Sequence, residues 1–281
     1  MVKQKSDHKK SLFSIVMSSL VHLAAGLTFL TIMAIVGYIL VKGIPYITPS
    51  LFAWTYTSEN VSLLPAFINT LFIVIVTLIV ALPMGIGGAI YLVEYAKQNN
   101  RFIWLIRLTA ETLTGIPSIV YGLFGAIFFV KFCHLGLSLL SGSLTLAIMV
   151  LPIILRTTEE ALVMVPNSYR EGSYGLGAGK LRTIMQVVLP AAMPGILSGV
   201  ILSIGRIVGE SAALIFTAGT VAKVAMATSD SARSLAVHMY VISGEGLFLH
   251  QTYATAVVLL FIVIGLNLLA EAAAKFLNRE H

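Results

Sequence analysis

Charged residues are scarce in this chain of 281 residues, since Asp, Glu, Lys and Arg together make up 11% of it, against about 25% in a typical soluble domain. Cysteine occurs once, as Cys133, which excludes an intramolecular disulfide and a multi-cysteine metal site. Polar stretches are short, and the longest, near 42–65, 156–190 and 219–251, are each too small for an independent core. Because the chain is 58% hydrophobic, the sequence predicts an integral membrane protein without a soluble domain.

Apolar segments long enough to cross a bilayer, which takes about 20 helical residues, occur six times. They lie near residues 13–41, 66–93, 112–130, 138–155, 191–218 and 252–274. The first is too long for a signal peptide and no small-x-small cleavage site follows it, so we expect it to remain as a helix. The predicted fold class is an all-α membrane protein with six transmembrane helices. We expect residues 1–65, which hold the N-terminal tail, the first helix and an outer loop, to stand apart from a five-helix core over 66–281.

Basic residues are distributed unevenly between the two sides of this topology. With a cytosolic N-terminus, the inner segments hold Lys3, Lys5, Lys9, Lys10, Lys97, Arg101, Arg107, Arg156, Arg170, Lys180, Arg182, Lys275 and Arg279, and the outer segments hold Lys42, Lys131, Lys223 and Arg233. Positively charged loops resist translocation. We therefore expect both termini and the loop over 156–190 to be cytosolic. The same anchoring explains the net charge of +6 without nucleic-acid binding, because the basic residues are scattered over short loops.

Glycine and proline cluster inside the middle helices, at 83–88 and 115–125. The fifth segment adds the pairs Gly195 with Gly199 and Gly205 with Gly209. Such residues bend helices and let their backbones approach closely. Two interpretations remain open: tight packing of neighbouring helices, and a flexible group of helices that forms a pore.

The cytosolic loop from Glu171 to Pro190 reads EGSYGLGAGKLRTIMQVVLP. The sequence predicts a short helix, a break at glycine, and a second helix that Pro190 stops. Together these form a compact knob that suits a docking cleft on another protein.

The glycines of this loop do not form a nucleotide-binding site. In Gly175-Leu-Gly-Ala-Gly179-Lys180 the four-residue spacer of a phosphate-binding loop is absent, Leu181 replaces the required Ser or Thr, and no strand precedes it. Any ATP must therefore bind to a separate subunit.

A charged pair, Arg206 and Glu210, lies inside the fifth apolar segment. At a spacing of four residues the two side chains share one face of a helix and can reach each other. A lone arginine at mid-membrane costs roughly 2.5 to 3.5 kcal/mol, so pairing or contact with water is expected. One hypothesis is that Arg206 attracts a tetrahedral oxyanion in transit while Glu210 weakens that attraction. The alternative is a buried pair that fixes helix packing and never touches substrate.

Enzyme motifs are not found. Neither G-x-S-x-G nor H-E-x-x-H occurs, and the prediction is that the chain is not an enzyme. His238 and His250 fall in the last outer segment, where we expect solvated or interfacial side chains. A proton-coupled role for them is the alternative, because histidine titrates near physiological pH.

The loop from Glu171 to Pro190 resembles the coupling loop of ABC importer permeases, whose pattern is E-A-A-x3-G-x9-I-x-L-P. Glu171, Gly177, Leu189 and Pro190 match it without insertion. Gly172-Ser173 replace the two alanines and Val187 replaces isoleucine, and these changes keep the side chains small or apolar. The resemblance implies that this loop docks an ATPase subunit.

Further stretches are similar to the PstA-type permeases of phosphate importers. They are PMGIGGAIYLVEYA (83–96), GIPSIVYGLFG (115–125), LPIILRTTEEALVMVPNSYREGSYGLGAGK (151–180), VVLPAAMPGILSGVILSIGRIVGESAALIFTAG (187–219) and SLAVHMYVISGEG (234–246). The fourth resembles the signature G-R-x-x-G-E-T-A-P-L-x-F-T-A, in which the Arg and Glu correspond to Arg206 and Glu210. Ser211 and Ala213 stand where that signature has Thr and Pro.

What the resemblance implies is a MetI-like ABC importer permease fold and an ATP-driven importer of inorganic phosphate in a bacterial or archaeal cytoplasmic (inner) membrane. The expected partners are a second permease of the PstC type, two PstB-type ATPases and a PstS-type phosphate-binding protein. No cofactor is expected on this chain, since the ATPase subunits hydrolyse the ATP. Rival hypotheses are a permease for sulfate, molybdate or tungstate, and a passive channel or secondary carrier, which would leave the coupling loop without a role.

Overall fold

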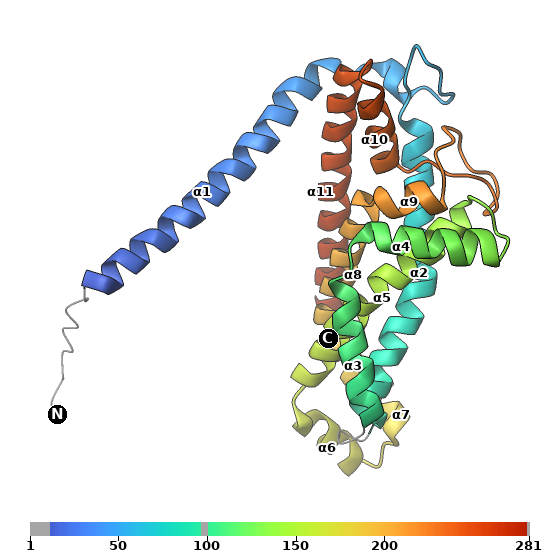
Figure 1. Ribbon diagram of the computed structural model, residues 1–281. Helices are drawn as coiled ribbons and strands as arrows, with labels where there is room; N and C mark the ends of the chain where they lie inside the picture. Colours follow the sequence, from blue (N-terminus) through green and yellow to red (C-terminus); the bar gives the residue numbers. More distant parts are fainter. Residues whose placement is uncertain (1–11, 97–100, 280–281) are drawn as a thin grey trace.

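A computed structural model describes residues 12–96 and 101–279, and no strand occurs within these ranges. The α-helices are α1 (Leu12–Gly43), α2 (Leu64–Ile90), α3 (Arg101–Thr114), α4 (Ser118–Gly125), α5 (Leu139–Met164), α6 (Asn167–Gly175), α7 (Lys180–Thr183), α8 (Leu189–Gly209), α9 (Ala212–Thr217), α10 (Leu235–Glu245) and α11 (Leu249–Arg279). Three segments are π-helical. Tyr91–Tyr95 extends α2, Ala126–Phe132 extends α4, and Ile184–Val188 joins α7 to α8. Short 3₁₀ turns, Ile44–Tyr46 and Pro49–Phe52, follow α1. Figure 1 shows the helices in a long bundle.

Five helical segments of the described chain are long and apolar enough to cross a membrane: Phe13–Tyr46, Leu64–Tyr95, Leu139–Met164, Lys180–Gly209 and Leu249–Leu269. Helix α3 together with α4 and its π-helical extension forms a pair bent by 105°, and counting this pair as one broken span brings the number to six. The predicted all-α architecture of six apolar segments is confirmed. The prediction that both termini are cytosolic stays a prediction, and residues 1–11 and 280–281 lie outside the described residues.

The third predicted helix, over 112–130, is wrong as one straight element. In Figure 1 α3 runs along the bundle and α4 lies across it. The bend falls at Gly115, Ile116 and Pro117, where Pro117 has no N–H to donate and its ring disfavours a helical conformation at Ile116. The glycine and proline cluster of this segment therefore turns the chain.

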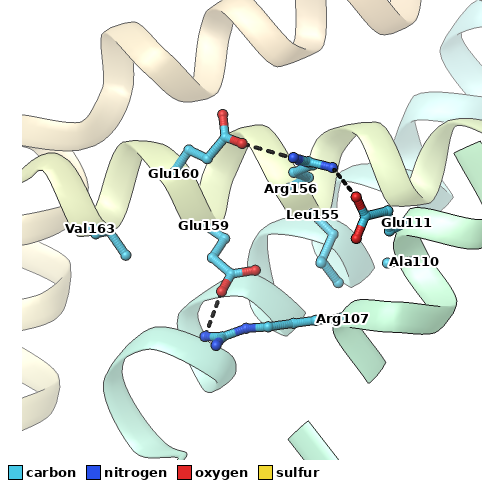
Figure 2. Close-up of a pocket in the computed structure, with 8 residues that line it drawn as sticks. All are labelled: Arg107, Ala110, Glu111, Leu155, Arg156, Glu159, Glu160 and Val163. Carbon is cyan, nitrogen blue, oxygen red and sulfur yellow. Dashed lines mark hydrogen bonds and ion pairs between the residues drawn. The ribbon is translucent and has the colours of Figure 1, made fainter. Parts of the chain in front are cut away.

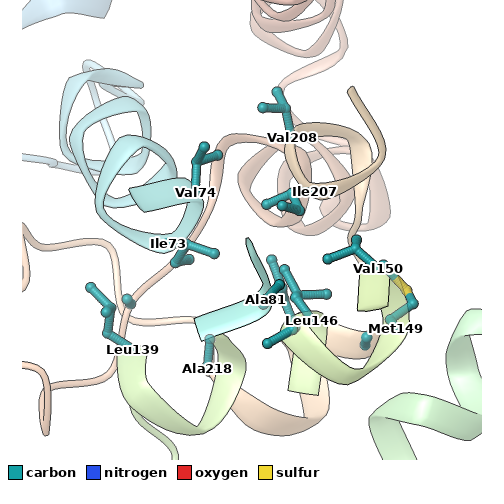
Figure 3. Packing of buried hydrophobic residues seen from close by; sticks show 14 of the residues in the cluster. Ile73, Val74, Ala81, Leu139, Leu146, Met149, Val150, Ile207, Val208 and Ala218 are labelled. Carbon is teal, nitrogen blue, oxygen red and sulfur yellow. The ribbon is translucent and has the colours of Figure 1, made fainter. Parts of the chain in front are cut away.

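The buried core centres on α5, which packs against α2, α8, α4 and α9. Figure 3 shows side chains of α2, α5 and α8 meeting in this core, among them Ile73, Leu146 and Ile207. A Cβ added to Gly195 of α8 would lie 2.6 Å from the Cβ of Ala161 in α5. At Gly205 and Gly209 an added Cβ would meet nothing within 4 Å. Close packing is thus confirmed for the first glycine pair and not for the second.

Helix α1 diverges from the bundle and meets it at one end (Figure 1). An added Cβ at Gly43, the last residue of α1, would lie 2.5 Å from a methyl group of Val257 in α11. Most of the other apolar side chains of α1 are exposed. From this meeting point α1 and α11 diverge toward the same side of the molecule, with opposite chain directions (Figure 1). The division of the chain at residue 65 stays a prediction.

The two ends of the bundle differ in construction. One end, called the knob end below, carries α6 and α7, and the opposite end carries α10 and the loop over 219–234 (Figure 1). Asn69 of α2 holds that loop: its side chain donates to the carbonyl of Lys223 at 2.8 Å and accepts from the N–H of Ala225 at 2.9 Å. Side-chain hydrogen bonds to backbone groups give this loop a defined shape although it lacks regular structure.

Candidate functional site

The knob begins with α6, which ends at a glycine turn as the sequence predicted. Gly177 has a φ of +83°, a conformation that glycine adopts at little cost and other L-residues disfavour. Its N–H donates to the carbonyl of Tyr174 at 2.9 Å, and the N–H of Ala178 donates to the carbonyl of Ser173 at 3.1 Å. This pair of hydrogen bonds is a Schellman motif that caps α6. A Cβ added at Gly177 would meet nothing within 4 Å. The glycine is therefore required for its positive φ and not for lack of space.

The prediction that Pro190 stops the second helix of the knob is wrong. Residues 180–209 form one continuous helical span that contains α7, a π-helical segment and α8. Pro190 lies in the first turn of α8. A proline inside a helix removes one N–H and crowds the carbonyl four residues earlier. The wider π-helical turn over Ile184–Val188 accommodates this, so the knob leads directly into a membrane-spanning helix.

The surface of the knob is open and carries large apolar side chains among polar ones. Leu176, at the turn between α6 and α7, is 91% exposed, and Tyr169, Tyr174 and Leu181 are also exposed. Glu171 lies exposed on α6, whereas Leu189 and Pro190 are half-buried at the start of α8. The predicted coupling residues thus divide into an outward part on α6 and an inward part on α8. Exposed apolar patches of this kind mark interaction sites.

An ion pair that the sequence analysis missed joins the knob to the bundle. The Nη2 of Arg170 in α6 lies 2.7 Å from Oε1 of Glu94, in the π-helical segment that extends α2. Both side chains are nearly buried, at 14% and 7% exposure. The same guanidinium donates to the carbonyls of Leu162 at 3.0 Å and Val165 at 2.8 Å, at the end of α5. One arginine therefore connects α6 with α2 and α5.

Further contacts close the base of the knob. The Nζ of Lys180 donates to the carbonyl of Glu94 and lies 4.6 Å from the ring centre of Tyr95. Ser173 and Thr183 share a hydrogen bond between their hydroxyls at 2.9 Å, which ties α6 to α7. The knob is consequently fixed to the ends of three membrane helices, α2, α5 and α8. Displacement of the knob must move these ends with it.

The interaction expected between Arg206 and Glu210 is not formed. Helix α8 ends at Gly209, and Glu210 has an extended backbone with φ −77° and ψ 126°. Its Oε1 accepts from the N–H of Ala213 at 3.2 Å, and so lies at the start of α9. The helical geometry that would align a pair four residues apart is lost at this break. Within the described part of the chain, no ion pair joins Arg206 to Glu210.

The expectation of a solvated His238 is also wrong. His238 of α10 is fully buried, and Nη1 of Arg233 donates to its Nδ1 at 3.4 Å. Burial, together with the positive charge of Arg233, lowers the pKa of His238 to about 4. Arg233 is itself 9% exposed and donates to the carbonyl of Thr220 at 2.7 Å. His250 does lie exposed, stacked on Tyr46 with ring centres 4.0 Å apart.

Comparison with known proteins identifies the family of this chain. Residues 81–280, well over half of the chain, match the family described as the inner membrane component of binding-protein-dependent transport systems. The chain belongs to this family. As a member, this permease is a multi-pass protein of the cytoplasmic membrane, and the family comprises transport components rather than a known class of enzyme.

Among the relatives, the phosphate transport system permease protein PstA of Mycobacterium leprae is 36% identical over 208 residues, which cover 72% of this chain and 67% of that protein. PstA of Haemophilus influenzae is 38% identical over 183 residues, 64% of each chain. The probable ABC transporter permease protein YqgI of Bacillus subtilis is 40% identical over 151 residues, 54% of this chain. The chain spans 51% of the length of YqgI and about two-thirds of the length of the two PstA proteins. Within its family the chain is thus of the PstA type.

Solved structures confirm the fold at low sequence identity. A chain of a bacterial ABC transporter involved in the import of the polysaccharide alginate superposes with a TM-score of 0.62 at 14% identity, covering 94% of this permease and 98% of that chain. A chain of the MetNI methionine transporter in an inward-facing conformation gives a TM-score of 0.54 at 18% identity, covering 85% and 96%. The expected MetI-like permease fold is therefore confirmed.

Proposed function

We propose that this permease forms half of the translocation pathway of an ATP-driven importer for inorganic phosphate. The observation that carries the proposal is the knob. Its exposed surface bears apolar side chains and is closed by a glycine turn at Gly177, Arg170 and Lys180 join it to the ends of α2 and α5, and it continues directly into α8. A channel or secondary carrier has no need for such a part. The phosphate specificity is supported by the PstA relatives.

The partners proposed are a second permease of the PstC type, two ATPases of the PstB type and a phosphate-binding protein of the PstS type. ATP is bound and hydrolysed by the ATPases, and no cofactor is assigned to this chain. The exposed apolar surface of α1 and α4 leaves room for a second permease. In this arrangement the knob end faces the cytosol with both termini, and the end with α10 receives the binding protein.

In the proposed mechanism, closure of the ATPase dimer displaces the knob, and the pathway then switches from one side of the membrane to the other. Glu171 and Gly177 shape the docking surface, and Leu189 and Pro190 carry the displacement into α8. Arg206 and Glu210 line the pathway at the break between α8 and α9. Because Glu210 already accepts the N–H of Ala213, Arg206 is left to attract the anion.

A second candidate function is import of another oxyanion, namely sulfate, molybdate or tungstate. Ser211 and Ala213 favour it, since they replace Thr and Pro of the resembled signature directly beside Glu210. Such a permease would use the same knob and differ in the protein that delivers the anion.

Uptake of labelled phosphate, by cells that lack this chain and by cells in which it is restored, tests the proposal. We expect uptake only in the restored cells, suppressed by excess unlabelled phosphate and unaffected by sulfate, molybdate or tungstate. Suppression by one of those three anions instead would replace phosphate with that anion. Uptake that persists after ATP depletion would contradict an ATP-driven importer.

A further inference from the structure

Three arginines of this permease are each followed by a glutamate four residues later. The pairs are Arg107 with Glu111 in α3, Arg156 with Glu160 in α5, and Arg206 with Glu210 at the end of α8. In a chain with 11% charged residues, the first two pairs each lie on one continuous helix, whereas α8 ends before Glu210. The first two pairs come together in space, between α3 and α5.

These two pairs line a cavity of about 580 Å³, together with Glu159, Ala110, Leu155 and Val163. Figure 2 shows the charged side chains converging from the two helices. Nη2 of Arg107 lies 2.6 Å from Oε1 of Glu159, across the gap between α3 and α5. Arg156 contacts Glu160 in its own helix at 3.1 Å and Glu111 of α3 at 3.7 Å. Each of the three carboxylates thus contacts a guanidinium and takes the place that a bound anion would occupy on it.

The cavity lies between the bend of α3 and α4 and the end of α5 that contacts the knob. Tyr121 of α4 donates to the carbonyl of Leu113 at the bend between α3 and α4, and Arg107 lies six residues before Leu113, about 9 Å along the helix. Glu159 lies three residues before Leu162, whose carbonyl is bound by Arg170. A displacement of the knob is therefore passed by Arg170 to a part of α5 that lies within one helical turn of Glu159 in the cavity.

Stability alone is a weak reason for this cluster. The side chains of Arg107 and Arg156 are 44% and 55% exposed, and ion pairs at such exposure contribute little to folding. A guanidinium binds the oxygens of a phosphate in a forked, two-point geometry. Conduction of an ion requires attraction that stays weak enough for release, and neighbouring carboxylates that compete for the same guanidinium supply that weakness.

We propose that this cavity is an oxyanion-binding site on the cytosolic half of the pathway, in which Arg107 and Arg156 receive the departing anion and Glu111, Glu159 and Glu160 compete for them and promote its release. That the anion is phosphate rests on the proposed function. The binding of a tetrahedral oxyanion at this cavity does not rest on it, so the existence of the site and its preference for phosphate are tested separately.

Chemical modification of arginine by phenylglyoxal, in membranes that contain the complete transporter, tests the site. Mass spectrometry of α3 and α5 peptides gives a modification rate for each arginine, with Arg101 of α3, which lies outside the cavity, as the matched control. At a phosphate concentration about ten times the dissociation constant, we expect modification of Arg107 and Arg156 to slow roughly tenfold. The rate at Arg101 should not change, and chloride at equal ionic strength should not protect.

The carboxylates are tested in the same assay. The double variant Glu111→Gln with Glu160→Gln removes both competitors of Arg156, and we expect half-maximal protection of Arg156 at about threefold lower phosphate, because exposed ion pairs compete only weakly.

Several outcomes would overturn the site: no protection by phosphate or sulfate, equal slowing at Arg101, or no modification of Arg107 and Arg156 in the absence of anion. Protection by sulfate and not by phosphate would keep the site and contradict the phosphate specificity.

Discussion

The position of single charged groups in this permease depends on local backbone geometry as much as on sequence spacing. Arg206 and Glu210 have the spacing of a helical ion pair, but the helix ends between them and Glu210 instead bonds the N–H of Ala213. Arg156 and Glu160 have the same spacing on an unbroken helix and do pair, at 3.1 Å. Helical spacing therefore predicts a pair only where the helix continues.

Replacement of Arg206 by Gln is expected to lower phosphate uptake by an order of magnitude or more, because the cationic group that attracts the anion is lost. Assembly should be unchanged, since Glu210 keeps its hydrogen bond to Ala213. The measurements are labelled-phosphate uptake and recovery of the purified transporter. A variant that fails to assemble would instead support a structural role for Arg206.

Acidification is expected to destabilise the end of the bundle that holds His238. Its pKa in the folded protein, about 4, lies below the usual value of 6.5, so between these values the unfolded chain binds a proton that the folded chain does not. Stability should fall by about 1.4 kcal/mol per pH unit over this window and show no dependence on His238 above pH 6.5. Thermal unfolding in detergent between pH 4 and 8 measures it. In His238→Gln the acid side of the profile should be flatter, and equal slopes would contradict this assignment.

At the scale of helices, the sequence predicts elements better than the contacts between them. Six apolar segments and the glycine turn at Gly177 follow from composition and from local backbone preference. The bend at Pro117 and the break after Gly209 change helix direction, and a glycine or proline marks where a change can occur without giving its angle. The contact between Glu94 and Arg170 joins residues 76 positions apart, which no helical periodicity encodes.

The ion pair of Glu94 and Arg170 is expected to transmit the displacement of the knob. Glu94→Gln removes the charge opposite a nearly buried guanidinium, a change that typically costs about 3 to 5 kcal/mol locally. We predict that phosphate uptake falls severalfold while the assembled transporter still hydrolyses ATP, so that more ATP is consumed per phosphate. Glu59→Gln, an exposed carboxylate at the opposite end, is the matched control. An unchanged ratio of ATP to phosphate in Glu94→Gln would exclude the ion pair of Glu94 and Arg170 from the coupling path.

At the scale of the whole molecule, the knob, its ion pair and the charged cavity all lie at one end or in the half adjoining it, whereas the opposite end is held by side-chain hydrogen bonds to a fixed loop. The two ends therefore differ: side-chain contacts join the knob to the membrane helices at one end, and hydrogen bonds hold an irregular loop at the other. α1 stands apart with its apolar side chains exposed, which accords with an assembly in which further subunits cover it.

The most direct test of the account is the ratio of phosphate transported to ATP hydrolysed by the reconstituted transporter carrying wild type, Gly177→Asn or Gly177→Asp. Asn tolerates a positive φ and adds no charge, so Gly177→Asn should retain most of the wild-type ratio. Asp tolerates the positive φ of Gly177 much as Asn does, so Gly177→Asp differs from Gly177→Asn by its charge on the docking surface, and we predict that transport is lost while the protein remains inserted in the membrane. Transport by Gly177→Asp at the wild-type ratio would contradict the assignment of the knob as the coupling element.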